Sequence, residues 1–222
     1  MVHVRKNMIC ACLAAVLMLS GCAGQGTQKN SNPTGESTEA VPPIKDLVCL
    51  EISRFSGGFV EDGTYEQVRD VAAILVANDT DKYLDLATVT YKVGERTATF
   101  RITGLPAGGM VWVLEKDRLV LAPEDQLVLR DCQAAYNANA ITSTRDLKVT
   151  REGNAYIVKN VSGKTLKNVC IYYKNTLESG VFLGGITFLM NFGDMEPGAE
   201  IKRASAHLGD NSNIVRYGYQ TE

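Results

Sequence analysis

The sequence predicts an all-β protein with two tandem β-sandwich domains. Apolar and polar residues alternate along 87–93 and again along 97–102, the period of two that places one face of a strand on a core and the other in water. Strand-like segments of this kind recur at intervals of roughly 8 to 15 residues, with turn residues between them. No helical period longer than about two turns follows the first 21 residues.

An internal repeat is the reason for expecting two domains. Residues 76–84 align without gaps on 158–166 at an offset of 82, and 87–92 align on 169–174 at the same offset. The Val, Asn, Lys, Leu and Tyr identities in this single register exceed what chance is expected to give. Farther along, the segment Leu105-Pro106-Ala107-Gly108 is similar to Met195-Glu196-Pro197-Gly198. We therefore expect one domain over 47–135 and a second over 145–222.

The amino terminus has the pattern of a bacterial secretory signal peptide. Basic residues precede an apolar run from 8 to 19, which is too short to span a bilayer because a transmembrane helix needs about 20 residues. The run ends in Leu19-Ser20-Gly21-Cys22, which resembles the lipobox of bacterial lipoproteins. That resemblance implies a signal peptide over 1–21, cleavage between Gly21 and Cys22, and a diacylglyceryl group on the Cys22 thiol.

The residues after the cleavage site predict a flexible tether. Residues 22–46 are rich in Gly, Gln, Thr, Asn, Ser, Pro and Glu and contain almost no large apolar side chain. Two acyl chains anchor a protein stably, so we expect it on the extracytoplasmic face of the cell membrane, with membrane lipid as a partner of Cys22. Loss of the leader lowers the net charge from −2 to −4, which argues against a nucleic-acid partner.

The second copy carries a family resemblance. The segments 160–174, Gly184-Gly185-Ile186-Thr187-Phe188 and 214–219 resemble the carboxy-terminal domain of lipoproteins from Gram-positive anaerobic bacteria. They resemble more loosely the FxLYD domains, which are small extracellular sandwich modules, although Tyr172-Tyr173-Lys174 stands where a Tyr-Asp pair is usual. The resemblance implies a cell-envelope location and an immunoglobulin-like β-sandwich in each copy, and it brings no catalytic residues.

Three cysteines follow Cys22 in the chain. Cys49 falls in the first expected strand of the first copy and Cys132 in its last, and such strands of a sandwich can come close enough for a disulfide. The alternative is two buried free thiols. Cys170 replaces Thr88 of the first copy and is expected to be a packed side chain.

The residues expected to remain after cleavage do not form a recognisable catalytic or metal-binding set. His207 is the one histidine beyond the leader, and no nucleophile motif surrounds it. No cluster of Cys and His has the spacing of a zinc site, and we expect no cofactor. Acidic pairs such as Glu61-Asp62 are typical of solvated turns. The sequence therefore favours a protein that is not an enzyme.

A longer hairpin distinguishes the second copy from the first. Between the shared Tyr and the shared Pro, the first copy has 14 residues and the second has 23. The added residues are largely apolar, and Cys170 and Tyr172 occupy positions of the preceding strand that should face water. These features predict an interaction surface, which contacts the first domain, a second subunit or a partner. Its expected residues are Tyr172, Phe182, Leu183 and Phe188.

Together these features predict a membrane-anchored, extracytoplasmic lipoprotein that acts as a non-enzymatic binding or interaction module with a protein partner. One alternative is a structural spacer or cell-envelope assembly factor without a ligand of its own. A more distant alternative is a hydrolase that uses carboxylates alone.

Overall fold

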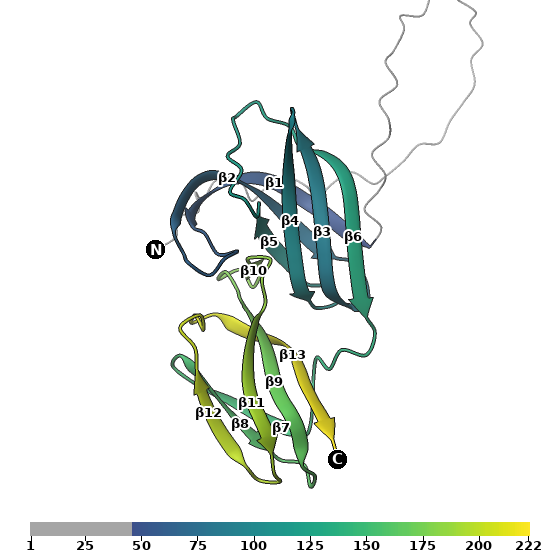
Figure 1. Ribbon diagram of the computed structural model, residues 1–222, viewed down its shortest axis with the longest axis vertical. Coiled ribbons are helices and arrows are strands. Elements are labelled where there is room, and N and C mark those ends of the chain that lie inside the picture. Colours follow the sequence, from purple (N-terminus) through teal and green to yellow (C-terminus); the bar gives the residue numbers. More distant parts are fainter. Residues whose placement is uncertain (1–45) are drawn as a thin grey trace, which may run out of the picture. The chain divides into compact units, whose positions relative to one another are not determined.

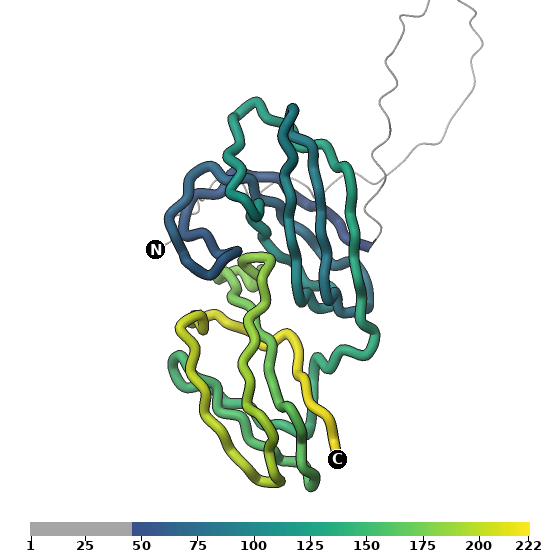
Figure 2. The backbone as a smooth tube through the Cα atoms, viewed as in Figure 1, coloured from purple at the N-terminus to yellow at the C-terminus, as the bar shows by residue number. Residues whose placement is uncertain are grey.

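The computed structural model describes residues 46–222, and all regular secondary structure in this range is β-strand (Figure 1). This confirms the prediction of an all-β, sandwich-type protein. Figure 2 traces the path of the backbone in the same view. The immunoglobulin-like topology of each copy stays a prediction. The signal peptide and the cleavage and lipidation positions, Gly21 and Cys22, lie outside the described residues.

Two facing sheets form what we call the first module, which consists of strands β1 to β6. One sheet has the order β1-β2-β5-β10, and the other has the order β4-β3-β6. The first sheet contains β1 (Leu47–Gly58), β2 (Gln67–Asn78), β5 (Met110–Leu114) and the two-residue β10 (Phe182–Leu183), which comes from much later in the chain. The second contains β3 (Tyr83–Val93), β4 (Arg96–Leu105) and β6 (Val128–Asn137).

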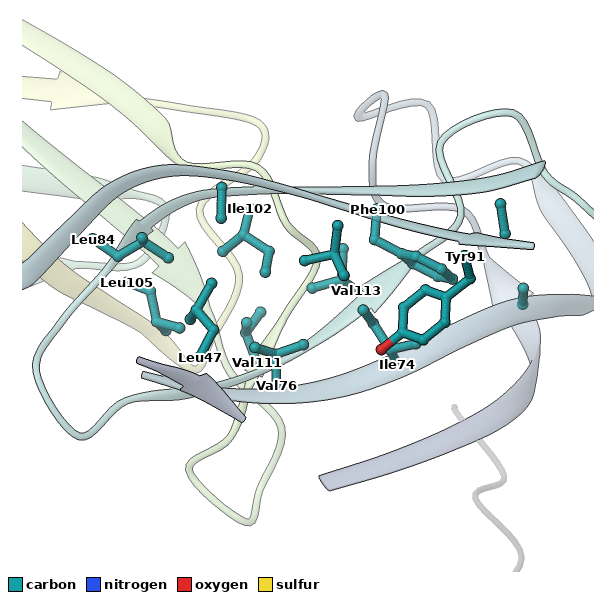
Figure 3. Packing of buried hydrophobic residues seen from close by; sticks show 14 of the residues in the cluster. Leu47, Ile74, Val76, Leu84, Tyr91, Phe100, Ile102, Leu105, Val111 and Val113 are labelled. Atoms are coloured by element: carbon teal, nitrogen blue, oxygen red, sulfur yellow. The ribbon is translucent and has the colours of Figure 1, made fainter. Parts of the chain in front are cut away.

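The core of the first module lies between these two sheets. Alternate residues of β3 and β4 point inward, as the period of two predicts, and meet the inward residues of β2 and β5 (Figure 3). Tyr91 and Phe100 pack edge to face, with their ring centroids 5.8 Å apart. The labelled core residues are Leu47, Ile74, Val76, Leu84, Tyr91, Phe100, Ile102, Leu105, Val111 and Val113.

A second pair of sheets forms the second module, with the orders β11-β9-β13 and β12-β8-β7. Its own core contains Tyr156, Val158, Ile171, Tyr173 and Phe192. The strands are β7 (Leu147–Glu152), β8 (Ala155–Asn160), β9 (Leu166–Asn175), β11 (Phe188–Met195), β12 (Glu200–Ala204) and β13 (Ser212–Thr221).

One buried asparagine in each module organises an equivalent turn. The Nδ2 of Asn78 donates to the carbonyl of Lys82 at 2.8 Å and to that of Leu105 at 3.1 Å. In the second module the Nδ2 of Asn160 donates to the carbonyl of Lys164 at 2.8 Å and to that of Met195 at 2.9 Å. Each asparagine therefore joins the end of one strand to two other segments of its module.

The same two side chains also accept hydrogen bonds. The Oδ1 of Asn78 accepts from the Thr80 hydroxyl at 2.8 Å, and the Oδ1 of Asn160 accepts from the Ser162 hydroxyl at 2.7 Å. Both asparagines are fully buried, so these bonds replace those that water would make. The repeat thus keeps an Asn followed by a Ser or Thr because this pair forms the same buried hydrogen bonds in both modules.

Replacing Asn160 with Ala should destabilise the protein by about 3 kcal/mol, because the buried Met195 carbonyl, the Lys164 carbonyl and the Ser162 hydroxyl lose their partner. Urea unfolding measures the loss. Asn213→Ala, at an exposed position, is the matched control and should change stability by less than about 0.5 kcal/mol. Equal effects of the two substitutions would contradict the structural role of Asn160.

Candidate functional site

The longer hairpin of the second module, residues 176–187, joins the first module. Its strand β10 pairs in parallel with β5, so that Phe182 lies opposite Val111 and Leu183 opposite Trp112. The amide of Gly184 then donates to the Trp112 carbonyl at 2.8 Å. The hairpin therefore extends a sheet of the first module beyond β5.

The same hairpin also bonds the other sheet of the first module. The Thr103 amide, on β4, donates to the Gly185 carbonyl at 2.7 Å. The Thr187 hydroxyl donates to the Thr103 carbonyl at 2.6 Å. Because β4 and β5 belong to facing sheets, the hairpin closes this flank of the sandwich and covers both strand edges there.

Apolar side chains of the hairpin pack into the first module as well. Phe182 packs against its main core. Leu183 packs against a smaller cluster on the outer face of the β2–β5 sheet, which includes Phe59, Val71 and Leu114. Of the contacts that the sequence left open, Phe182 and Leu183 make the one with the first module.

We call the contact between the hairpin 176–187 and the first module the joint. Lys174, on β9, is buried at its centre with none of its surface exposed. Its Nζ donates to the carbonyls of Ile186 at 2.6 Å, Gly185 at 3.1 Å and Thr103 at 3.1 Å. The first two acceptors belong to the hairpin and the third to β4. One amino group therefore ties the second module, the hairpin and the first module together.

Glu61, in the loop between β1 and β2, binds the same hairpin from the first module. Its Oε2 accepts from the Gly185 amide at 2.8 Å, and its Oε1 accepts from the Leu114 amide at 2.8 Å. The sequence pattern favoured a solvated turn for Glu61-Asp62, but Glu61 instead satisfies two backbone amides of the joint. Asp62 keeps its turn role and accepts from the amide and hydroxyl of Thr64.

Burial changes the proton affinity of both groups. Removal from water lowers the pKa of Lys174 to about 7, and the opposing influence is the charge of Glu61. Removal from water raises the pKa of Glu61, opposed by the amides of Gly185 and Leu114 and by Lys174. The joint therefore holds two ionisable groups whose charged forms are both disfavoured by burial.

Aromatic rings form a second contact between the modules. The ring of His207 stacks on Phe188, with centroids 4.9 Å apart, and on Tyr65 of the first module at 6.4 Å. Phe188 in turn stacks on Tyr173 at 5.3 Å. Phe188 and His207 are therefore both occupied in packing within the chain.

Tyr172 lies elsewhere, on the outer face of the β11-β9-β13 sheet. It stands opposite Leu189 on one side and Arg216 on the other. The Arg216 guanidinium lies 5.1 Å from the centroid of the Tyr172 ring and pairs with the Asp85 carboxylate at 3.0 Å. Leu189 is 58% exposed. We call Leu189, Tyr172 and Arg216 the outer row.

The structure thus does not gather the four residues expected at the interaction surface. Phe182 and Leu183 enter the first module, Phe188 joins the ring stack, and Tyr172 faces outward. Sequence reasoning missed Lys174, Glu61 and the exposed neighbour of Tyr172. The one sequence signal for Leu189 was the expected outward position of Tyr172, because Leu189 lies opposite Tyr172 on the neighbouring strand.

The three cysteines of the described range are free thiols. Cys49 lies on β1, Cys132 on β6 and Cys170 on β9, and each is half-buried. The pairing of Cys49 with Cys132 stays a prediction.

Two kinds of feature are absent from residues 46–222. In this range, no group of three or more His, Cys, Asp or Glu side chains is arranged to hold a metal ion. None of the secondary structure there is a helix long and apolar enough to cross a membrane. No protein-family model matches the chain, and no curated protein matches it.

Gly185 has no room for a side chain, because a Cβ there would overlap the carbonyl oxygen of Arg101. Gly185→Ala should therefore push the hairpin away from β4 and destabilise the protein by about 2 to 3 kcal/mol in urea unfolding. Gly163→Ala is the matched control, since no atom lies within 4 Å of a Cβ at that turn glycine. Equal stability of the two variants would contradict the tight fit of the hairpin.

Lys174 should make stability depend on pH. Its folded pKa, about 7, lies below its ordinary value of 10.5, so between these values the unfolded state binds a proton that the folded state has lost. The free energy of unfolding should therefore rise with pH across this window, by up to about 1.4 kcal/mol per unit. The raised pKa of Glu61 acts in the opposite sense, from its ordinary value of 4.5 upward, because there the folded state binds the extra proton.

Urea unfolding between pH 8 and pH 10 measures this slope. Lys174→Met removes the titrating amine, so the variant should be less stable overall. Its free energy of unfolding should also rise less steeply with pH, by up to about 1.4 kcal/mol per unit, because the proton of Lys174 no longer contributes. Tyrosine titration affects both proteins and cancels in the comparison. An unchanged slope in the variant would show that Lys174 keeps its ordinary pKa in the fold.

Proposed function

We propose that this chain is a lipid-anchored, extracytoplasmic lipoprotein of the bacterial cell envelope that binds a protein partner without catalysing a reaction. The observation that carries the binding role is the outer row. Leu189 is exposed there beside Tyr172, while Arg216 pairs with Asp85 on β3 of the first module.

The composition of the outer row supports a protein partner. Tyrosine and arginine are enriched at the centres of protein interfaces, where a few such residues supply most of the binding energy. Arg216 is held by Asp85 and by the Tyr172 ring before any partner arrives. Because the side chain is already ordered, binding there costs less conformational entropy than it would for a free arginine.

The lipobox supports the location. A lipid on Cys22 and a tether of two dozen residues would keep the start of the first module within about 30 Å of the headgroups. The joint supports a fixed arrangement of the two modules, because the hairpin, Lys174 and Glu61 connect them. The outer row would then keep one orientation relative to the first module. An envelope partner would then meet the outer row close to the membrane.

The joint also favours the second candidate, a structural spacer without a ligand. A spacer needs two modules held firmly together, which the hairpin provides, and needs no exposed binding residue. The two functions differ in their dependence on the outer row, because only a binding protein should lose its activity when that row is changed.

The double substitution Tyr172→Ser with Leu189→Ser tests the binding role. Reversible cross-linking in native membranes, followed by purification, should recover a stoichiometric partner with the unaltered protein and at least about tenfold less with the variant. Val161→Ser removes a comparably exposed apolar side chain, at 50% exposure, and should leave recovery unchanged.

Two outcomes would count against the proposal. Equal recovery with the double variant would exclude the outer row, and no stoichiometric partner with the unaltered protein would favour the spacer. Cys22→Ala, assayed alongside, should move the chain from the membrane to the soluble fraction, and retention on the membrane would contradict the lipid anchor.

A further inference from the structure

The first module has one flank that the hairpin does not cover. In the sheet β1-β2-β5-β10, β1 and β10 are the two edges, and in the sheet β4-β3-β6, β4 and β6 are the edges. The hairpin bonds β5 and β4, so β1 and β6 form the other flank. Within residues 46–222, β1 pairs with β2 alone and β6 with β3 alone.

Each strand of this open flank carries a cysteine whose side chain points toward the core. Cys49 lies opposite Val76, and Cys132 lies opposite Val89. Both valines are fully buried core residues, and directly opposed residues of an antiparallel pair share a face. Both thiols indeed pack against the core of the first module, one from each facing sheet.

Tyr91 brings the two thiols into one neighbourhood. Its ring stands in the core between the sheets (Figure 3). Burial, together with the neighbouring Cys49 and Cys132 thiols, raises the pKa of its hydroxyl. Two thiols from different sheets therefore converge on one phenol at the open flank.

We propose that Cys49 and Cys132 are a redox-active pair that closes this flank by forming a disulfide through exchange with an external disulfide. A thiolate of the pair attacks the external disulfide, forms a mixed disulfide and expels one thiol. The second thiolate attacks the protein sulfur of that mixed disulfide and expels the other thiol. The two electrons and two protons of the pair thus leave on the reduced external molecule.

The surroundings of the two thiols set the order of these steps. Burial and the neighbouring Asp131 raise the pKa of the Cys132 thiol, so less of it is present as the attacking thiolate. The mixed disulfide is therefore expected on Cys49, with Cys132 as the resolving thiol. Cys170 takes no part, because it lies in the second module on the outer face that holds Tyr172, beside Gly218.

Mass spectrometry after exchange with oxidised glutathione tests the proposal on the full chain. The reduced protein should lose two hydrogen atoms, Cys49 and Cys132 should resist alkylation, and Cys170 should still be alkylated. Closing a loop of 84 residues should raise the midpoint of thermal unfolding by about 10 °C. Alkylation of both Cys49 and Cys132 after exchange, or a bridge to Cys170, would overturn the proposal.

Two single variants test the order of the steps. Cys132→Ser should accumulate one glutathione on Cys49, because the resolving thiol is missing. Cys49→Ser should gain glutathione on Cys132 more slowly, since that thiol is the less reactive one. Cys170→Ser is the matched control and should form the Cys49–Cys132 bridge as the unaltered protein does. If Cys170→Ser abolished the bridge, or if Cys132→Ser left Cys49 unmodified, the assignment would be wrong.

Discussion

The burial of the Lys174 amine is the constraint on which the joint depends. A buried ammonium or amine must find hydrogen-bond acceptors, because the cost of leaving it without them is several kcal/mol. The acceptors here are carbonyls of the hairpin and of β4, and they take up the required positions only when the hairpin lies between β4 and β5. The lysine therefore selects one arrangement of the two modules over looser ones.

Glu61 extends this selection from the other side. Its carboxylate accepts from Gly185 and Leu114, so the hairpin is bonded through its amides to one acidic group and through its carbonyls to one basic group. Apolar packing of Phe182 and Leu183 supplies the area removed from water, while the polar groups determine the register. Apolar packing and hydrogen bonding thus both act on the hairpin, residues 176–187.

The all-β architecture could be predicted because its signal is local. Alternation along β3 and β4 reports directly on which face is buried, and the buried residues Val89, Tyr91, Phe100 and Ile102 follow that period. The turn asparagines were also visible, because turn chemistry is encoded over a few neighbouring residues. Such features need no knowledge of how distant segments meet.

The joint could not be predicted because its signal is not local. Lys92 and Lys174 occupy the same position of the repeat, yet Lys92 is partly exposed and Lys174 fully buried. The difference comes from the hairpin and from Glu61, which lies more than a hundred residues earlier in the chain. Phe182 and Phe188 look alike in the sequence, and only the fold sends the first into one core and the second against His207.

The position of β10 in the chain has a consequence for the order in which the molecule can form. A polypeptide is made from its amino terminus, and domains generally fold as they emerge. The strands of the first module end at Asn137, but the hairpin that covers the edges of β4 and β5 ends about 50 residues later. Until that hairpin has been made, two strand edges of the first module remain uncovered. During synthesis, the first module can therefore be completed only after the hairpin has emerged, and until then the edges of β4 and β5 can pair with other chains.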